Sequence, residues 1–124
     1  MAKRKKSILW LDHVEEHDYL AADSYLRLIY EDKTVKGIVK RLRKAEITEF
    51  KAKDIFRASS LSLLGVSNSH VEKDSQKIAK GTALSPLLLV RAPSLGKVIV
   101  ADGYHRVCAI YLVDEDALIH CKIV

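Results

Sequence analysis

The residues best suited to chemistry lie where an apolar run, residues 98–101, passes through a glycine into a helix. Gly103 permits a tight turn there. The first turn of a helix leaves backbone N–H groups unpaired, and the helix dipole adds partial positive charge. Arg106 can grip a phosphate with its guanidinium, and His105 can donate a hydrogen bond or move a proton. The sequence therefore predicts a phosphate-binding turn formed by Asp102, Gly103, Tyr104, His105 and Arg106.

Asp102, the acid at the start of this turn, admits three roles. It can cap the helix, orient His105 or Arg106, or hold a magnesium ion. An acid directly before a helix is most commonly a cap, so we expect that role for Asp102. If the turn is catalytic, His105 and Asp102 are the residues expected to act.

The elements around the turn follow from local patterns. Two segments rich in β-forming residues, 87–91 and 98–101, flank a Pro- and Gly-containing turn at 92–97, which is typical of a hairpin. A helix is expected over residues 104–112. A last strand is expected over 117–124, where the pattern alternates.

The chain before the hairpin is expected to be largely helical. Helices are predicted over residues 19–30, capped by Asp18, and over 35–44, with a turn at 31–34 and the pair forming an antiparallel hairpin. The first helix would bury one face carrying Ala22, Tyr25, Leu26 and Ile29.

The middle of the chain is less regular. A short strand fits residues near 47–53, where a helix remains an alternative. An ordered loop over 59–69 and a helix over 70–80 that Gly81 stops should follow.

Composition indicates one domain spanning residues 1–124, with a helical extension at 1–45 and an α+β unit at 46–124. No apolar run is long enough for a membrane span or a signal peptide, so we expect a soluble, cytoplasmic protein. Cys108 and Cys121 lie in apolar patterns and are expected to be reduced and buried.

The net charge of +5 is uneven, with acids prevailing over 12–32 and bases over 33–57. The bases can meet phosphates, nucleic acid, an acidic partner or the chain's own acids.

The order strand, loop, strand, Asp-Gly-Tyr-His-Arg, helix, strand resembles the superfamily of ParB N-terminal domains and sulfiredoxins. The equivalent turn is Gly-Glu-Arg-Arg in partition proteins, Gly-Cys-His-Arg in sulfiredoxins and Asp-Gly-His-His-Arg in free serine kinases. The resemblance covers about residues 46–124. It implies a small mixed sheet with helices, here preceded by the helical hairpin.

The resemblance also implies site residues. Gly103 would shape the turn, while His105 and Arg106 would contact the phosphates of a nucleoside triphosphate or diphosphate bound with magnesium. Lys73, Ser75 and Lys77 occupy the region from which sulfiredoxins reach the nucleotide. Arg57 corresponds, by order of elements, to an arginine near the nucleotide in partition proteins; a solvated basic loop is the alternative for Arg57 and its neighbours.

Departures from the superfamily limit the function. Tyr104 replaces the sulfiredoxin nucleophile, so we expect no sulfinic acid reductase activity. The chain ends after the last predicted strand without a helix-turn-helix module, so we expect no sequence-specific DNA binding. The leading hypothesis is a nucleotide- or phosphate-binding domain, with phosphotransferase activity left open. The alternative is a noncatalytic adaptor that binds a protein or, nonspecifically, a nucleic acid; a homodimer is compatible with either.

Residues 13–17 match a known metal-binding spacing. His13-Val14-Glu15-Glu16-His17 has the H-x-x-E-H spacing, in which two histidines one helical turn apart can share a metal. A third ligand is not evident, and the segment borders the predicted helix start. We therefore interpret it as an exposed helix start and predict no metal site.

Overall fold

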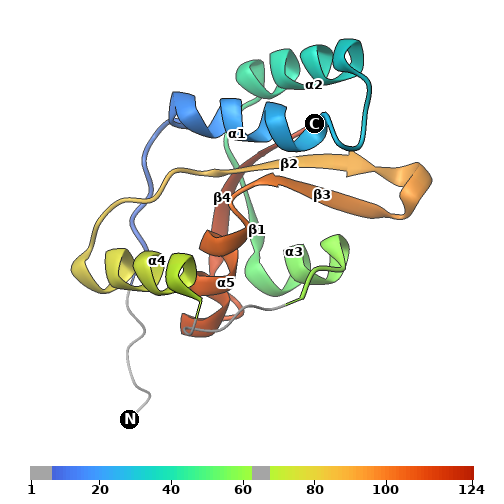
Figure 1. Cartoon of the computed structure of the whole chain (residues 1–124). Coiled ribbons are helices and arrows are strands. Elements are labelled where there is room, and N and C mark those ends of the chain that lie inside the picture. Colours follow the sequence, from blue (N-terminus) through green and yellow to red (C-terminus); the bar gives the residue numbers. More distant parts are fainter. Residues whose placement is uncertain (1–6, 63–67) are drawn as a thin grey trace.

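The computed structural model describes residues 7–62 and 68–124, which form helices on both faces of one mixed sheet (Figure 1). The expectation of an α+β fold that begins with helices is confirmed. The elements are α1 (Glu16–Leu26), α2 (Asp32–Lys44), β1 (Thr48–Lys51), α3 (Ala52–Ser59), α4 (Ser69–Lys80), β2 (Leu87–Ala92), a short 3-10 turn (Pro93–Leu95), β3 (Lys97–Asp102), α5 (Tyr104–Val113) and β4 (Leu118–Ile123).

The sheet has the strand order β1-β4-β2-β3. β2 and β3 form the predicted antiparallel hairpin, β1 pairs antiparallel with β4, and β4 runs parallel to β2. The parallel pair requires a crossover, which α5 supplies. The turn predicted to bind phosphate lies at the end of β3, which is an edge strand of the sheet.

Alternation along the strands divides the interior into two layers. On β2, Leu87 and Leu89 face a core shared with α3, α4 and α5, whereas Leu88 and Val90 face a core shared with α1 and α2. Successive side chains of a strand point to opposite faces, so a sheet covered on both sides needs an apolar run. The uninterrupted apolar residues at 87–90 meet that need.

The N-terminal helices lie over one face of the sheet, as Figure 1 shows. The predicted bounds of the first helix are wrong, because α1 begins at Glu16 after an N-cap at Glu15 and ends at Leu26. Asp18 is not the cap; it lies inside the helix with 3% of its surface exposed. Residues 27–30 form the turn that lets α2 begin at Asp32, earlier than expected.

The prediction of which residues the first helix buries is wrong in part as well. Ala22 and Leu26 are fully buried, but Tyr25 and Ile29 remain 43% and 40% exposed. The helix has almost no amphipathic pattern, so the side it buries was set by packing on β3.

The segment after α2 forms both a strand and a helix, the two structures that its pattern left open. Thr48–Lys51 is a strand, and Ala52–Ser59 is a helix that follows directly. The predicted loop at 59–69 lies partly outside the described residues, since 63–67 are not described. α4 matches its prediction closely: Asn68 accepts hydrogen bonds from the amides of His70 and Val71, and Gly81 ends the helix with φ 74°.

Both cysteines are buried, and neither forms a disulfide with another described residue, as expected. Burial raises the pKa of Cys121 to about 12, so this thiol stays protonated and unreactive at neutral pH. Among the described residues, none of the helices has the length and apolarity needed to cross a lipid bilayer.

Candidate functional site

The turn between β3 and α5 depends on Gly103. Its φ of 105° lies in the left-handed region, and a Cβ there would stand 2.5 Å from Leu87 Cγ and 2.9 Å from Arg106 Nη2. Gly103 is the N-cap of α5 and has no side chain to cap the first amides. The first helical bond runs from the amide of Val107 to the carbonyl of Gly103, so the amides of the first turn are available to an anion.

Asp102 does not cap α5, and that expectation is wrong. Arg106 Nη2 donates a 2.8 Å hydrogen bond to Asp102 Oδ2 across one helical turn. Of the three roles considered for Asp102, the structure shows one, the orientation of Arg106. The cause is local: with Gly103 in the left-handed conformation, the carboxylate meets the guanidinium instead of the helix amides.

The same guanidinium meets a second carboxylate from the N-terminal helix. Arg106 Nη2 lies 3.5 Å from Asp18 Oδ2, and the two side chains are only 16% and 4% exposed. Neither Asp18 Oδ2 nor Arg106 Nε has a hydrogen-bond partner among the described residues. One largely buried cation therefore serves two carboxylates, Asp18 and Asp102, and we call these three residues the Arg106 cluster.

A polar pocket of about 210 Å³ opens between α4 and the start of α5. It joins Lys73 and Lys77 of α4 to the whole turn, so two lysines suggested by the resemblance meet the turn in space. The full lining is His70, Lys73, Asp74, Lys77, Asp102, Gly103, Tyr104, His105 and Arg106.

His70 and Asp74 were not predicted. They stand with Lys73 and Lys77 at spacings of three and four residues, and such positions share one face of a helix. A polar stripe at positions 70, 73, 74 and 77, aligned with the turn, is the signal that could have identified them.

Arg57 is not in this pocket. Its side chain is 83% exposed and lies 3.8 Å from Asp54 on its own helix. The order of elements alone could not position it, because α3 packs beside β1 and α5 while α4 supplies the pocket wall. The neighbouring Lys53 pairs with Asp116 at 2.6 Å, which holds it away as well.

Two side chains of the pocket have shifted pKa values, His105 and Asp74. Burial lowers the pKa of His105, and His70, whose ring centroid is 4.8 Å away, acts in the same direction, so His105 is neutral at pH 7 and can accept a proton. Burial raises the pKa of Asp74, while the charges of Arg106 and Lys77 act in the opposite direction.

Tyr104 links the turn to the segment after α3. Its hydroxyl donates a hydrogen bond to the carbonyl of Ser62. A second hollow of about 300 Å³ lies on the other side of the turn, with Tyr25, Leu61 and Tyr104 on its wall. The turn from Asp102 to His105 lines both hollows, so one ligand could extend across it.

The donors present do not make a metal site by themselves. Among the residues that the structure describes, no group of three or more His, Cys, Asp and Glu is placed to hold an ion. Asp102 is engaged by Arg106, so it is a poor lone ligand for magnesium. His13 lies before α1 begins, and it pairs with Asp12 at 2.7 Å, so His13 and His17 do not share a helical face.

The Asp102 carboxyl should make stability depend on pH. Its burial, with Asp18 adding to the effect and Arg106 opposing it, raises its pKa from 3.8 to about 6. The folded protein then binds this proton more tightly than the unfolded chain does. The stabilisation is complete below about pH 4 and is lost as the pH rises through 6, with an upper limit of about 3 kcal/mol.

Urea unfolding of the wild type and of Asp102→Asn at pH 4, 5, 6 and 7 checks this. The stability of the wild type relative to the variant should fall across that range. Glu46→Gln, at an exposed carboxyl, is the control and should give no such trend. A relative stability of Asp102→Asn that stays constant with pH would show that Asp102 titrates normally.

Comparison of this chain with known protein families, curated proteins and solved structures gives no significant match. The resemblance to the ParB and sulfiredoxin superfamily therefore remains a prediction that depends on the turn motif and the order of elements. The fold and the pocket define an α+β domain with a polar, lysine-bearing pocket at the start of a helix.

Proposed function

We propose that this protein binds a phosphorylated ligand, with a nucleotide as the leading candidate, in the pocket between α4 and α5. The observation that supports this best is the meeting of Lys73 and Lys77 with the uncapped start of α5. Two ammonium groups, free amides and the positive end of a helix are the combination that phosphate prefers. A pocket of about 210 Å³ is large enough for one or two phosphoryl groups.

In this proposal Arg106 acts mainly by shaping the pocket. Asp102 and Asp18 already occupy its guanidinium, so direct phosphate binding falls chiefly to the lysines and the amides of the turn. His105 would donate a hydrogen bond to a phosphate oxygen. A bound phosphate beside it would favour the protonated ring and raise its pKa.

The nucleotide is favoured over inorganic phosphate because of the adjoining hollow. Tyr25 and Tyr104 present aromatic surface there, on the far side of the same turn. Aromatic rings are suitable stacking surfaces for a base. A nucleoside lying against them would direct its phosphates over Gly103 toward Lys73 and Lys77.

Phosphotransfer is a further possibility of the same site. The neutral His105 can accept a proton from an acceptor hydroxyl, and the lysines can stabilise charge on the transferred group. Magnesium, if it is used, would arrive with the nucleotide and be held largely by its phosphates, as magnesium commonly is.

Thermal unfolding with ATP, ADP, CTP, GTP and inorganic phosphate, each with and without magnesium, tests the proposal. A ligand at about 100 times its dissociation constant should add roughly 2.7 kcal/mol, a shift of several degrees. Lys73→Ala and Lys77→Ala should each reduce the shift strongly. Lys80→Ala is the matched control, since Lys80 is on the same helix but outside the pocket.

Equal shifts in Lys77→Ala and Lys80→Ala would show that any binding occurs elsewhere. The absence of a shift with every ligand, in a protein that unfolds cooperatively, would contradict the proposal.

The second candidate is nonspecific binding of nucleic acid by α2. The exposed side of this helix carries Lys33, Lys36, Lys40, Arg41 and Lys44, while its apolar side is buried. Because that binding depends on counterion release, it should weaken steeply with salt. A duplex that binds at low salt and is unaffected by Lys77→Ala, but is lost in Lys36→Glu with Lys40→Glu, would favour this candidate.

A further inference from the structure

Another cavity, with an apolar lining, lies at the opposite end of the β2–β3 hairpin from the turn at Gly103. Its lining includes Arg91 and Val98, which pair near the β2–β3 connection, whereas the phosphate turn follows Asp102. α3 forms its wall with Ile55 and Ala58. The cavity measures about 200 Å³ and is open to solvent.

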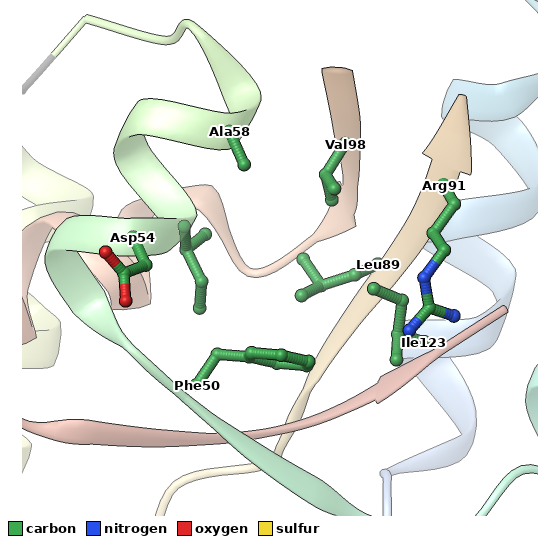
Figure 2. A pocket seen from close by; sticks show the side chains of 8 residues that line it. Phe50, Asp54, Ala58, Leu89, Arg91, Val98 and Ile123 are labelled. Atoms are coloured by element: carbon green, nitrogen blue, oxygen red, sulfur yellow. The ribbon is translucent and has the colours of Figure 1, made fainter. Parts of the chain in front are cut away.

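The interior of this cavity is almost wholly apolar. Figure 2 shows Leu89, Val98 and Phe50 directed into it from three different strands, with Ala58 above them. Phe50 keeps 37% of its surface exposed although it belongs to the sheet. An apolar hollow of this kind gains by taking up an apolar group.

Of the described residues that line the cavity, two are charged, Asp54 and Arg91, and they lie on opposite sides of it, as Figure 2 shows. Asp54 has a cationic neighbour, because Arg57 lies 3.8 Å away. Arg91 is exposed, and no carboxylate of the described residues forms an ion pair with it. The cavity therefore offers one free guanidinium at one side of an apolar interior.

We propose that this cavity binds a small monocarboxylate with an apolar body, such as one aromatic ring on a short chain. An apolar cavity of roughly 150 Å³ accommodates benzene, so about 200 Å³ accommodates a ring and a few methylene groups. The carboxylate pairs with Arg91, whose planar guanidinium matches it in two hydrogen bonds. Asp54 on the other side repels the carboxylate and thereby fixes the orientation of the ligand.

This site is independent of the proposed phosphate site. None of the residues that line this cavity also lines the pocket between α4 and α5. A failure of nucleotide binding would therefore leave the carboxylate proposal intact, and the reverse is also true.

The test is a titration of methyl-labelled protein with 4-phenylbutyrate, followed by NMR. Saturable shifts are expected at the methyl groups of Leu89, Val98 and Ile123. Arg91→Gln should weaken binding about tenfold, as should replacing the probe by neutral 4-phenylbutanol. Ala58→Leu, which fills the cavity without removing core atoms, should abolish binding, while Arg41→Gln on the opposite side of the sheet should not alter it.

Three results would overturn the proposal. The first is the absence of saturation at these methyl groups up to about 10 mM probe, a concentration that covers weak ligands. The second is equal affinity for the acid and the alcohol, which would remove Arg91 from recognition. The third is a change in the chemical shifts of the same methyl groups when only the protein concentration is varied, which would identify a second copy of the chain as the occupant.

Discussion

Arg106→Leu is expected to destabilise the protein by about 3–5 kcal/mol, since removing one partner of a buried ion pair leaves the other charge uncompensated. Here two carboxylates lose the guanidinium, those of Asp18 and Asp102, which lie 3.5 and 2.8 Å from it; Asp18 keeps only the exposed His17, at 3.2 Å. Chemical denaturation at pH 7 measures the loss. Adding Asp18→Asn and Asp102→Asn to the variant should restore part of it, because the amides carry no charge.

Arg43→Leu is the matched control. Arg43 makes two hydrogen bonds to Glu16, a closer pairing than that of Arg106, but it lies at the surface. Exposed pairs contribute roughly 0–1 kcal/mol, so the control should lose little. Similar losses in the two variants would show that burial of the Arg106 cluster does not matter for stability.

The Arg106 prediction affects how binding is tested. A variant of Arg106 that loses ligand affinity could do so because α1 and α5 separate, since Asp18 is on α1 and Arg106 on α5. Lys73 and Lys77 are the better probes of the pocket, as they lie on the solvent side of α4 and hold no core contact.

Gly103→Ala is expected to destabilise the protein by about 2–6 kcal/mol, the second large effect. A residue other than glycine in a sparsely populated backbone region costs about 1–3 kcal/mol, and overpacking costs about 1–3 kcal/mol more. Both apply, because φ is 105° and the added Cβ would overlap Leu87 Cγ at 2.5 Å. Leu87 is fully buried in the sheet and cannot move away easily.

Gly37→Ala is the control, and it is expected to stabilise the protein. Gly37 lies inside α2, and nothing stands within 4 Å of the Cβ that the substitution adds. Alanine should therefore stabilise this helix by about 0.5–1 kcal/mol. Denaturation midpoints of the two variants that move in the same direction would contradict this account of the turn.

The sequence by itself determined the elements around the turn. The hairpin, the helix after it, the last strand and the helix stopped by Gly81 all match the predicted segments closely. These predictions succeed because alternation, helical spacing and glycine conformation are properties of a few neighbouring residues. The tight turn at Gly103, whose φ is 105°, was predictable for the same reason.

Only the tertiary structure decided which distant residues meet the turn. It brings Asp18 from α1 to Arg106, joins His70 and Asp74 to the lysines, and leaves Arg57 at the surface. These outcomes depend on how helices pack on a sheet, which involves residues far apart in the chain. Local pattern carries no information on such contacts, and so Asp18 could be identified as a partner of Arg106 only once the helices were in place.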